Sequence, residues 1–148
     1  MILNGRKLYD AKPISPMLGM KLRDYGVSYG LTEAGYDVRI RQDVLLHPFR
    51  RFALASTIEQ FHVPENLVAV LHDKSTNIRR GLMVGNTVLE PGWSGGLTLE
   101  LFYFGWKPLR LKAGTGIGQV IFHELTEPAR YAGKYQDQSA DPVPAILA

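Results

Sequence analysis

Short strand-forming runs, separated by Gly, Pro and Asn, recur between residues 36 and 125 and constrain the fold of this chain most. Tyr36, Val38 and Ile40 alternate with polar residues, and residues 51–63 form a long run rich in β-branched and aromatic side chains. We expect further strands at 67–71, 82–84, 87–89, 97–104, 109–111 and 117–125. Many short strands at close spacing are typical of an all-β barrel or sandwich.

The two ends of the chain lack this pattern. Residues 3–9 and 17–25 are expected to form two short helices, with Pro13 and Pro16 between them. From Thr126 onward the sequence has three prolines and few large apolar residues, which indicates a tail that is mobile or ordered only on contact. No internal repeat or linker is visible, so residues 1–148 are interpreted as one domain that ends in this tail.

The composition excludes several classes of protein and site. Cysteine is absent, so disulfides, thiolate metal sites and the zinc base deaminases that need a cysteine pair are excluded. No two of the four histidines have the spacing of metal ligands, so no metal site is expected. The net charge of +3 is scattered, which favours a small anionic ligand such as a nucleotide over nucleic acid. No bilayer-spanning run or signal peptide is visible, so we expect a cytoplasmic protein with no membrane partner.

Three polar stretches are candidates for chemistry. The first, Asp73–Gly81, carries groups that can bind phosphate oxygens, or it is a polar loop whose helical turn is capped by Ser75 or Thr76. The second carries Glu100 on the strand face that also holds Thr98 and aromatic residues. This acid is either solvated, or desolvated with a raised pKa and able to shuttle protons. The third, at 133–138, is by itself a polar extension.

Taken together, these stretches resemble the dCTP deaminases, which are relatives of the trimeric dUTPases. The resemblance covers nearly the whole chain and rests on AGYDVRI at 34–40, LHPFRRFALASTIEQFHVPENLVAVLHDKST at 46–76, RRGLMV at 79–84, PGWSGGLTLEL at 91–101, KPLRLKAGTGIGQVIF at 107–122 and KYQDQ at 134–138. It implies a distorted β-barrel or jelly roll that forms a homotrimer with active sites between subunits. It also implies deamination of dCTP to dUTP and ammonia without catalytic zinc, with Mg²⁺ bound to the triphosphate.

The resemblance assigns roles to individual residues. Glu100 matches the catalytic glutamate, Ser75 the serine that helps to hold the attacking water, and Arg79 the arginine beside the base. The tail, 126–148, is expected to close over the nucleotide. Substrate contacts are implied for Lys74, Thr76, Asn86, Thr87, Val88, Trp93, Gln119, Tyr131, Lys134 and Gln138. Lys74 stands where the family usually has arginine.

One departure from the family leaves the reaction open. The hairpin between Val84 and Pro91 is shorter than in family deaminases, and Glu90 occupies the position of the aspartate that activates water in dUTPases. Three hypotheses follow: a dCTP deaminase, a bifunctional enzyme forming dUMP and pyrophosphate, and a non-catalytic nucleotide-binding relative. Glu100 together with Ser75 and Arg79 favours catalysis. We expect dUTP as the product, because Glu90 need not share a pocket with Glu100 and is longer than aspartate.

Overall fold

The computed structural model describes residues 1–147, and residue 148, the last of the predicted tail, lies outside the described residues. Two short helices, α1 (Gly5–Ala11) and α2 (Ser75–Ile78), accompany a set of strands. The strands are β1 (Ile2–Leu3), β2 (Ile14–Ser15), β3 (Lys21–Asp24), β4 (Val27–Leu31), β5 (Tyr36–Arg39), β6 (Val44–Leu46), β7 (Phe52–His62), β8 (Leu67–Asp73), β9 (Leu82–Val84), β10 (Thr87–Leu89), β11 (Ser94–Tyr103), β12 (Leu109–Leu111) and β13 (Gly116–Glu124).

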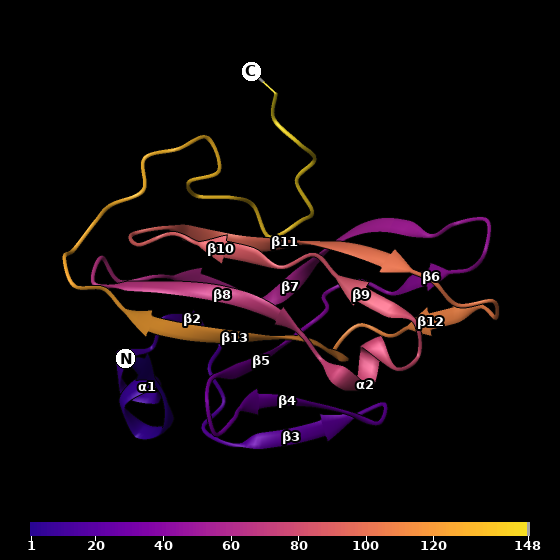
Figure 1. The fold of residues 1–148 in the computed structure, drawn as a ribbon, viewed down its shortest axis with the longest axis horizontal. Helices are drawn as coiled ribbons and strands as arrows, with labels where there is room; N and C mark the ends of the chain where they lie inside the picture. Colours follow the sequence, from indigo (N-terminus) through magenta and orange to yellow (C-terminus); the bar gives the residue numbers. More distant parts are fainter. Residues whose placement is uncertain (148) are drawn as a thin grey trace.

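The strands form two main sheets with one core between them. The larger sheet has the order β10-β8-β13-β5-β4-β3, with β1 also paired to β13, and the smaller has the order β2-β7-β11-β9 (Figure 1). Strands β12 and β6 form a separate ribbon. Val38, Leu71 and Phe122 of the larger sheet and Leu99 of the smaller one are fully buried in the same cluster. Burial of such side chains contributes about 1.5–3 kcal/mol each, which makes this core the main stabilising element of the fold.

The strand predictions from the sequence are confirmed for the central part of the chain. The bounds at 82–84, 87–89 and 109–111 are those of β9, β10 and β12, and the 51–63 run is β7 with one residue trimmed from each end. The prediction of a mostly β fold is therefore confirmed within residues 1–147.

The helix expected at residues 17–25 is wrong. The second half of this segment is strand β3, which pairs with β4 through a two-residue turn at Tyr25 and Gly26. Both turn residues have positive φ, 51° and 77°, as a tight hairpin of this kind requires. The other predicted helix exists, but α1 begins at Gly5, and Leu3 belongs to a strand.

A buried ion pair ties the two sheets together. Arg39 of β5 donates to Glu59 of β7 twice, from its backbone N and from Nε, each at 2.8 Å. Glu59 is fully buried, and burial raises the pKa of its carboxyl although the Arg39 contacts oppose the rise. Removing one partner of such a pair typically costs about 3–5 kcal/mol, so this contact fixes how the sheets meet.

The tail beyond β13 contains no helix or strand in its described part, yet it lies on the smaller sheet. In Figure 1 it runs, in yellow, across β10 and β11, on the side of the molecule opposite α1 and the β3–β4 hairpin. No helix within residues 1–147 is both long enough and apolar enough to cross a lipid bilayer.

Candidate active site

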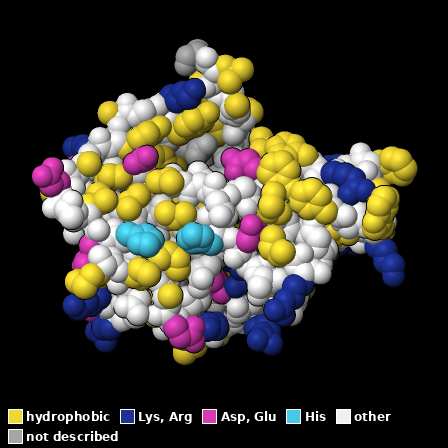
Figure 2. Space-filling model, in the orientation of Figure 1, with side chains coloured by type: hydrophobic (Ala, Val, Ile, Leu, Met, Phe, Trp, Pro, Cys, Tyr) yellow, Lys and Arg dark blue, Asp and Glu magenta, His cyan; other side chains and the backbone are white. Residues whose placement is uncertain are grey.

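The outer face of the smaller sheet, strand β10 and the tail line a cavity of about 470 Å³, here called the Glu100 cleft. Seven of the sequence-predicted site residues line it: Thr87, Val88, Glu90, Trp93, Glu100, Tyr131 and Gln138. Phe52, Leu54 and Leu97 add apolar walls. Figure 2 shows hydrophobic side chains gathered where the tail meets the body of the molecule. A mostly apolar cleft with a few polar groups is the usual form of a small-molecule site.

Glu100 lies in this cleft because strand alternation turns it away from the core, between the buried Leu99 and Leu101. Its neighbours across the sheet are Leu54 on β7 and Gly85 beyond β9, and Gly85 N donates to Glu100 O at 2.8 Å. Burial raises the pKa of the Glu100 carboxyl, and its own backbone opposes the rise. A half-buried carboxyl with a raised pKa is suited to taking up and releasing protons during a reaction.

Glu90 lines the same cleft as Glu100. We expected that these two acids need not share a pocket, but the structure places both of them in this cleft. Glu90 follows β10, and its side chain is exposed at the rim, whereas Glu100 is half-buried. No Lys or Arg side chain of residues 1–147 lines this cleft. The two carboxylates are thus not balanced by any cation of the same cleft.

The tail is anchored to the start of β11 by main-chain contacts. Gly96 N donates to Gln138 O at 3.0 Å, and Asp137 N donates to Ser94 O at 2.9 Å. A Cβ added at Gly96 would lie 2.5 Å from Ser139 O, so only glycine permits this approach. Trp93 is buried, and its indole N–H donates to Tyr135 O at 2.6 Å. Gly95 and Gly96, at the start of β11, thus provide the surface on which the tail docks.

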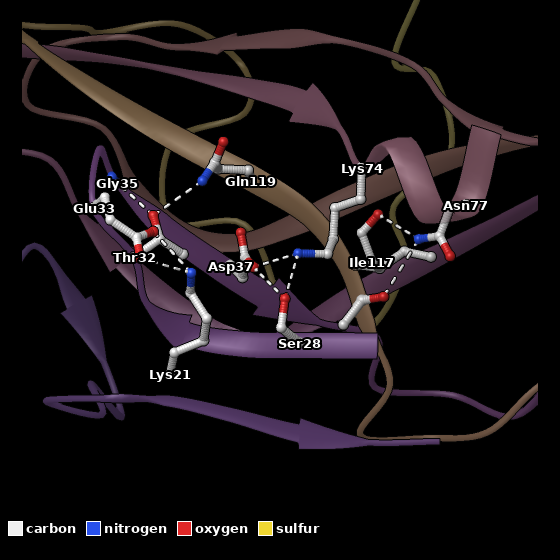
Figure 3. A network of polar contacts seen from close by, with 11 residues as sticks. Lys21, Ser28, Thr32, Glu33, Gly35, Asp37, Lys74, Asn77, Ile117 and Gln119 are labelled. Carbon is white, nitrogen blue, oxygen red and sulfur yellow. Dashed lines mark hydrogen bonds and ion pairs between the residues drawn. The ribbon is translucent and has the colours of Figure 1, made fainter. Parts of the chain in front are cut away.

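A second, polar cavity of about 430 Å³, the Lys74 cleft, lies between β4, β5, β13 and the start of α2 (Figure 3). It holds the predicted phosphate contacts Lys74, Thr76 and Gln119 together with Ser75. Lys74 Nζ is paired with Asp37 Oδ2 and lies 3.1 Å from Ser28 Oγ. The other oxygen of Asp37 is buried without a hydrogen-bond partner in the described structure.

The four-residue helix α2 carries the predicted catalytic residues Ser75 and, at its end, Arg79. Its N-cap is Lys74, without a side-chain cap, so the interpretation of Ser75 or Thr76 as N-cap is wrong. The helix is held from beneath by Asn77, which is fully buried and donates to Gly116 O and Ile117 O at 3.3 and 3.2 Å. Ser75 and Arg79 are exposed as a result.

The predicted site residues are thus divided between two clefts of one chain. Glu100 lies in one, Ser75 lies in the other, and Arg79 lines neither. Lys134 also lines neither, because its ammonium group contacts Ile146 O and the Tyr135 ring. Asn86 is exposed in the turn between β9 and β10.

Sequence reasoning missed the roles of three residues. In the sequence Asp37 is one of the polar positions of an alternating strand, and only its pairing with Lys74 across the fold shows its role. Thr98 and Tyr135 line the Glu100 cleft although neither was selected. The signal for Thr98 was present, because it shares the strand face of Glu100.

Comparison with known sequences identifies the relatives of this arrangement. A family profile described as dCTP deaminase-like matches residues 30–125. A dCTP deaminase of Campylobacter curvus is 36% identical over 82% of this chain and 83% of its own length. The dCTP deaminase of Roseiflexus castenholzii is 35% identical, over 85% of this chain and 86% of that relative.

Solved structures share the fold at low sequence identity. The dUTPase of Staphylococcus bacteriophage 80alpha superposes with a TM-score of 0.58 at 17% identity, covering 82% of this chain and 94% of that one. A dUTPase of EIAV gives a TM-score of 0.56 at 19% identity, covering 69% and 84%. The predicted dUTPase-like type of fold is confirmed.

Proposed function

The chain belongs to the dCTP deaminase family, and from this premise we propose that it hydrolyses dCTP to dUTP and ammonia. The observation that carries the proposal is the half-buried Glu100, whose pKa burial raises, on the wall of a cleft large enough for a nucleoside. The polar cleft with Lys74 and Thr76 provides groups for phosphate oxygens.

Glu100 performs the proton transfers in the proposed reaction. Its carboxylate takes a proton from water as the oxygen bonds to C4 of cytosine, and delivers the proton to N3. A second proton leaves the added hydroxyl for the amino group, the C4–N bond breaks, and ammonia departs. Acid–base work of this kind contributes ~10²–10⁴ in rate. Ser75 positions the water. The positive charge of Arg79 stabilises the negative charge that develops as water adds to the ring.

The proposed active site is shared between copies of the chain in a homotrimer. The Glu100 cleft contains two carboxylates and no cation within residues 1–147, so a triphosphate needs positive charge from elsewhere. Arg79 is exposed and can supply this charge to a neighbouring copy, and the exposed Ser75 can supply a hydroxyl to it. Phe52, on the wall of the cleft, is 51% exposed, and Phe104 and Trp106 are exposed at 62% and 83%. Apolar side chains exposed in this way favour a protein contact beside the site.

We propose that Mg²⁺ accompanies the triphosphate at the Lys74 cleft. The charged side chains of this cleft are three carboxylates, Glu33, Asp37 and Asp73, against two ammonium groups, Lys21 and Lys74. Asp37 retains a buried oxygen without a partner, and oxygen ligands are those that Mg²⁺ prefers. When bound, the ion would offset phosphate charge, while Lys74 and Thr76 would orient the phosphates.

As the pH is lowered, the rate of deamination is expected to begin to fall at a pH higher than the usual pKa of a glutamate. Burial raises the pKa of Glu100, and only the ionised form can accept the proton from water. As pH falls through this raised pKa the carboxylate is lost, so the acid limb of kcat/KM should lie above about 4.3, the usual glutamate value. A profile whose acid limb lies at or below that value would contradict this role.

The product is expected to be dUTP, with little pyrophosphate. Release of pyrophosphate requires a second water aligned with the α-phosphate, and Glu90 is an exposed glutamate where the related enzymes have a shorter aspartate. A misplacement near 1 Å can lower the rate about 10²-fold. Incubation with dCTP and Mg²⁺, followed by ion-exchange separation of the nucleotides and an ammonia assay, measures the outcome.

The bifunctional reaction is the second candidate, because Glu90 and Glu100 line one cleft. If dUMP and pyrophosphate dominate from the earliest time points, and Glu90→Gln stops their formation while ammonia release continues, this second candidate is correct. Binding of dCTP without release of ammonia would instead identify a non-catalytic relative.

A further inference from the structure

The hydroxyl of Thr98 is the point where the tail meets the Glu100 cleft. It accepts hydrogen bonds from Val143 N at 2.9 Å and from Gln138 Nε2 at 3.2 Å. Thr98 is only 7% exposed, lines the cleft, and lies two positions before Glu100 on the same strand face. Its oxygen therefore bonds two separate parts of the tail from the wall of the cleft itself.

The hydrogen of this hydroxyl remains unused within residues 1–147. A threonine hydroxyl has two lone pairs and one hydrogen, and both lone pairs are taken by the tail. The hydrogen can be donated to an acceptor in the cleft, such as an oxygen of a bound nucleotide. Donation to the ligand would fix the Thr98 hydroxyl with its lone pairs toward the tail. It would also polarise the oxygen, which makes it a stronger acceptor for the tail.

We propose that Thr98 is a positioning residue that couples closure of the tail to occupancy of the Glu100 cleft. A hydroxyl that donates a hydrogen bond becomes a stronger acceptor, and one that accepts becomes a stronger donor. A ligand that accepts from Thr98 therefore tightens the tail, and a docked tail favours the ligand. The nature of the ligand rests on the proposed function. The hydrogen bonds from Val143 and Gln138 to the Thr98 hydroxyl, here called the latch, rest only on contacts within the chain.

Ser56 offers a matched control for Thr98. It is the cross-strand partner of Thr98 on β7 and also holds the tail, through a 2.6 Å hydrogen bond from its Oγ to Ala140 O. Ser56 does not line the Glu100 cleft. Ser56→Ala therefore removes a tail contact, together with the 2.8 Å hydrogen bond that Gln42 Nε2 donates to Ser56 Oγ, without removing a group that faces the ligand.

Hydrogen exchange of the tail amides in the nucleotide-free protein tests the latch. Thr98→Val keeps the shape and strand propensity of the side chain but loses the hydroxyl, and the Val143 amide should exchange about tenfold faster. Thr98→Ser should restore slow exchange. Unchanged exchange in folded Thr98→Val would overturn the proposal.

Exchange with dCTP and Mg²⁺, measured in a Glu100→Gln background to prevent turnover, tests the coupling. Nucleotide should slow tail exchange when position 98 is Thr or Ser and in Ser56→Ala, but not in Thr98→Val. In the Glu100-containing protein, Thr98→Val should raise KM for dCTP about tenfold and change kcat less. Full slowing by nucleotide in Thr98→Val would refute the coupling. If dCTP slows exchange in no variant, the proposal that dCTP is the substrate is contradicted, and so is the coupling of the tail to dCTP. The measurement without nucleotide still tests the hydrogen bonds of Thr98 to the tail.

Discussion

Replacing Glu100 by Gln should lower deamination of dCTP by at least ~10²-fold while nucleotide binding is retained. The amide has nearly the shape of the carboxyl but cannot accept a proton from water. The neighbours of Glu100, Leu54 and Gly85, make no hydrogen bond to its carboxylate in the described structure, and the amide oxygen of Gln can still accept from the residue's own backbone. Steady-state release of ammonia and a binding titration with dCTP separate the two effects.

Glu90→Gln is the matched control for this substitution. It changes a carboxylate of the same cleft to an amide, but the Glu90 side chain is exposed at the rim. Deamination should persist in Glu90→Gln. Near-normal turnover in Glu100→Gln would contradict the assignment of Glu100 as the general acid/base. Loss of deamination in Glu90→Gln alone would assign that role to Glu90.

Much of the fold was predictable because local signals and tertiary packing agree in the central part of the chain. Gly, Asn and Pro bound the strands around 82–89, and the bounds of β9 and β10 were predicted to the residue. The helix predicted at 17–25 is wrong because Tyr25 and Gly26, both with positive φ, form the turn of a hairpin. A two-residue hairpin overrides helix propensity once the neighbouring strand is available.

The content of the site was predictable from the motifs, but its geometry was not. Alternation along β11 placed Glu100 and Thr98 on one face. No local pattern could show that Ser75 would lie in a cleft separate from Glu100, because this depends on how β8 and β11 are placed in different sheets. Nor could the sequence show that Lys74 pairs with Asp37, thirty-seven positions earlier in the chain.

The division of the site between two clefts leads to the second large effect, which is recovery of activity by mixing inactive chains. Arg79→Ala should lose ~10²–10³ in rate, because the charge that stabilises the reacting ring is removed. In a trimer formed from equal amounts of Arg79→Ala and Glu100→Gln chains, some neighbouring pairs combine an intact Glu100 cleft with an intact Arg79. Random assembly gives about a quarter of all sites this composition.

Co-refolding the two variants together, with light scattering to establish a mass of about three times 16.5 kDa, tests the shared site most directly. Ammonia release from dCTP should return to about a quarter of the unsubstituted level, whereas folded variants mixed without subunit exchange should stay inactive. If mixed trimers form and remain no more active than either variant alone, Glu100 and Arg79 act within one chain, and the account of a site assembled between copies is wrong.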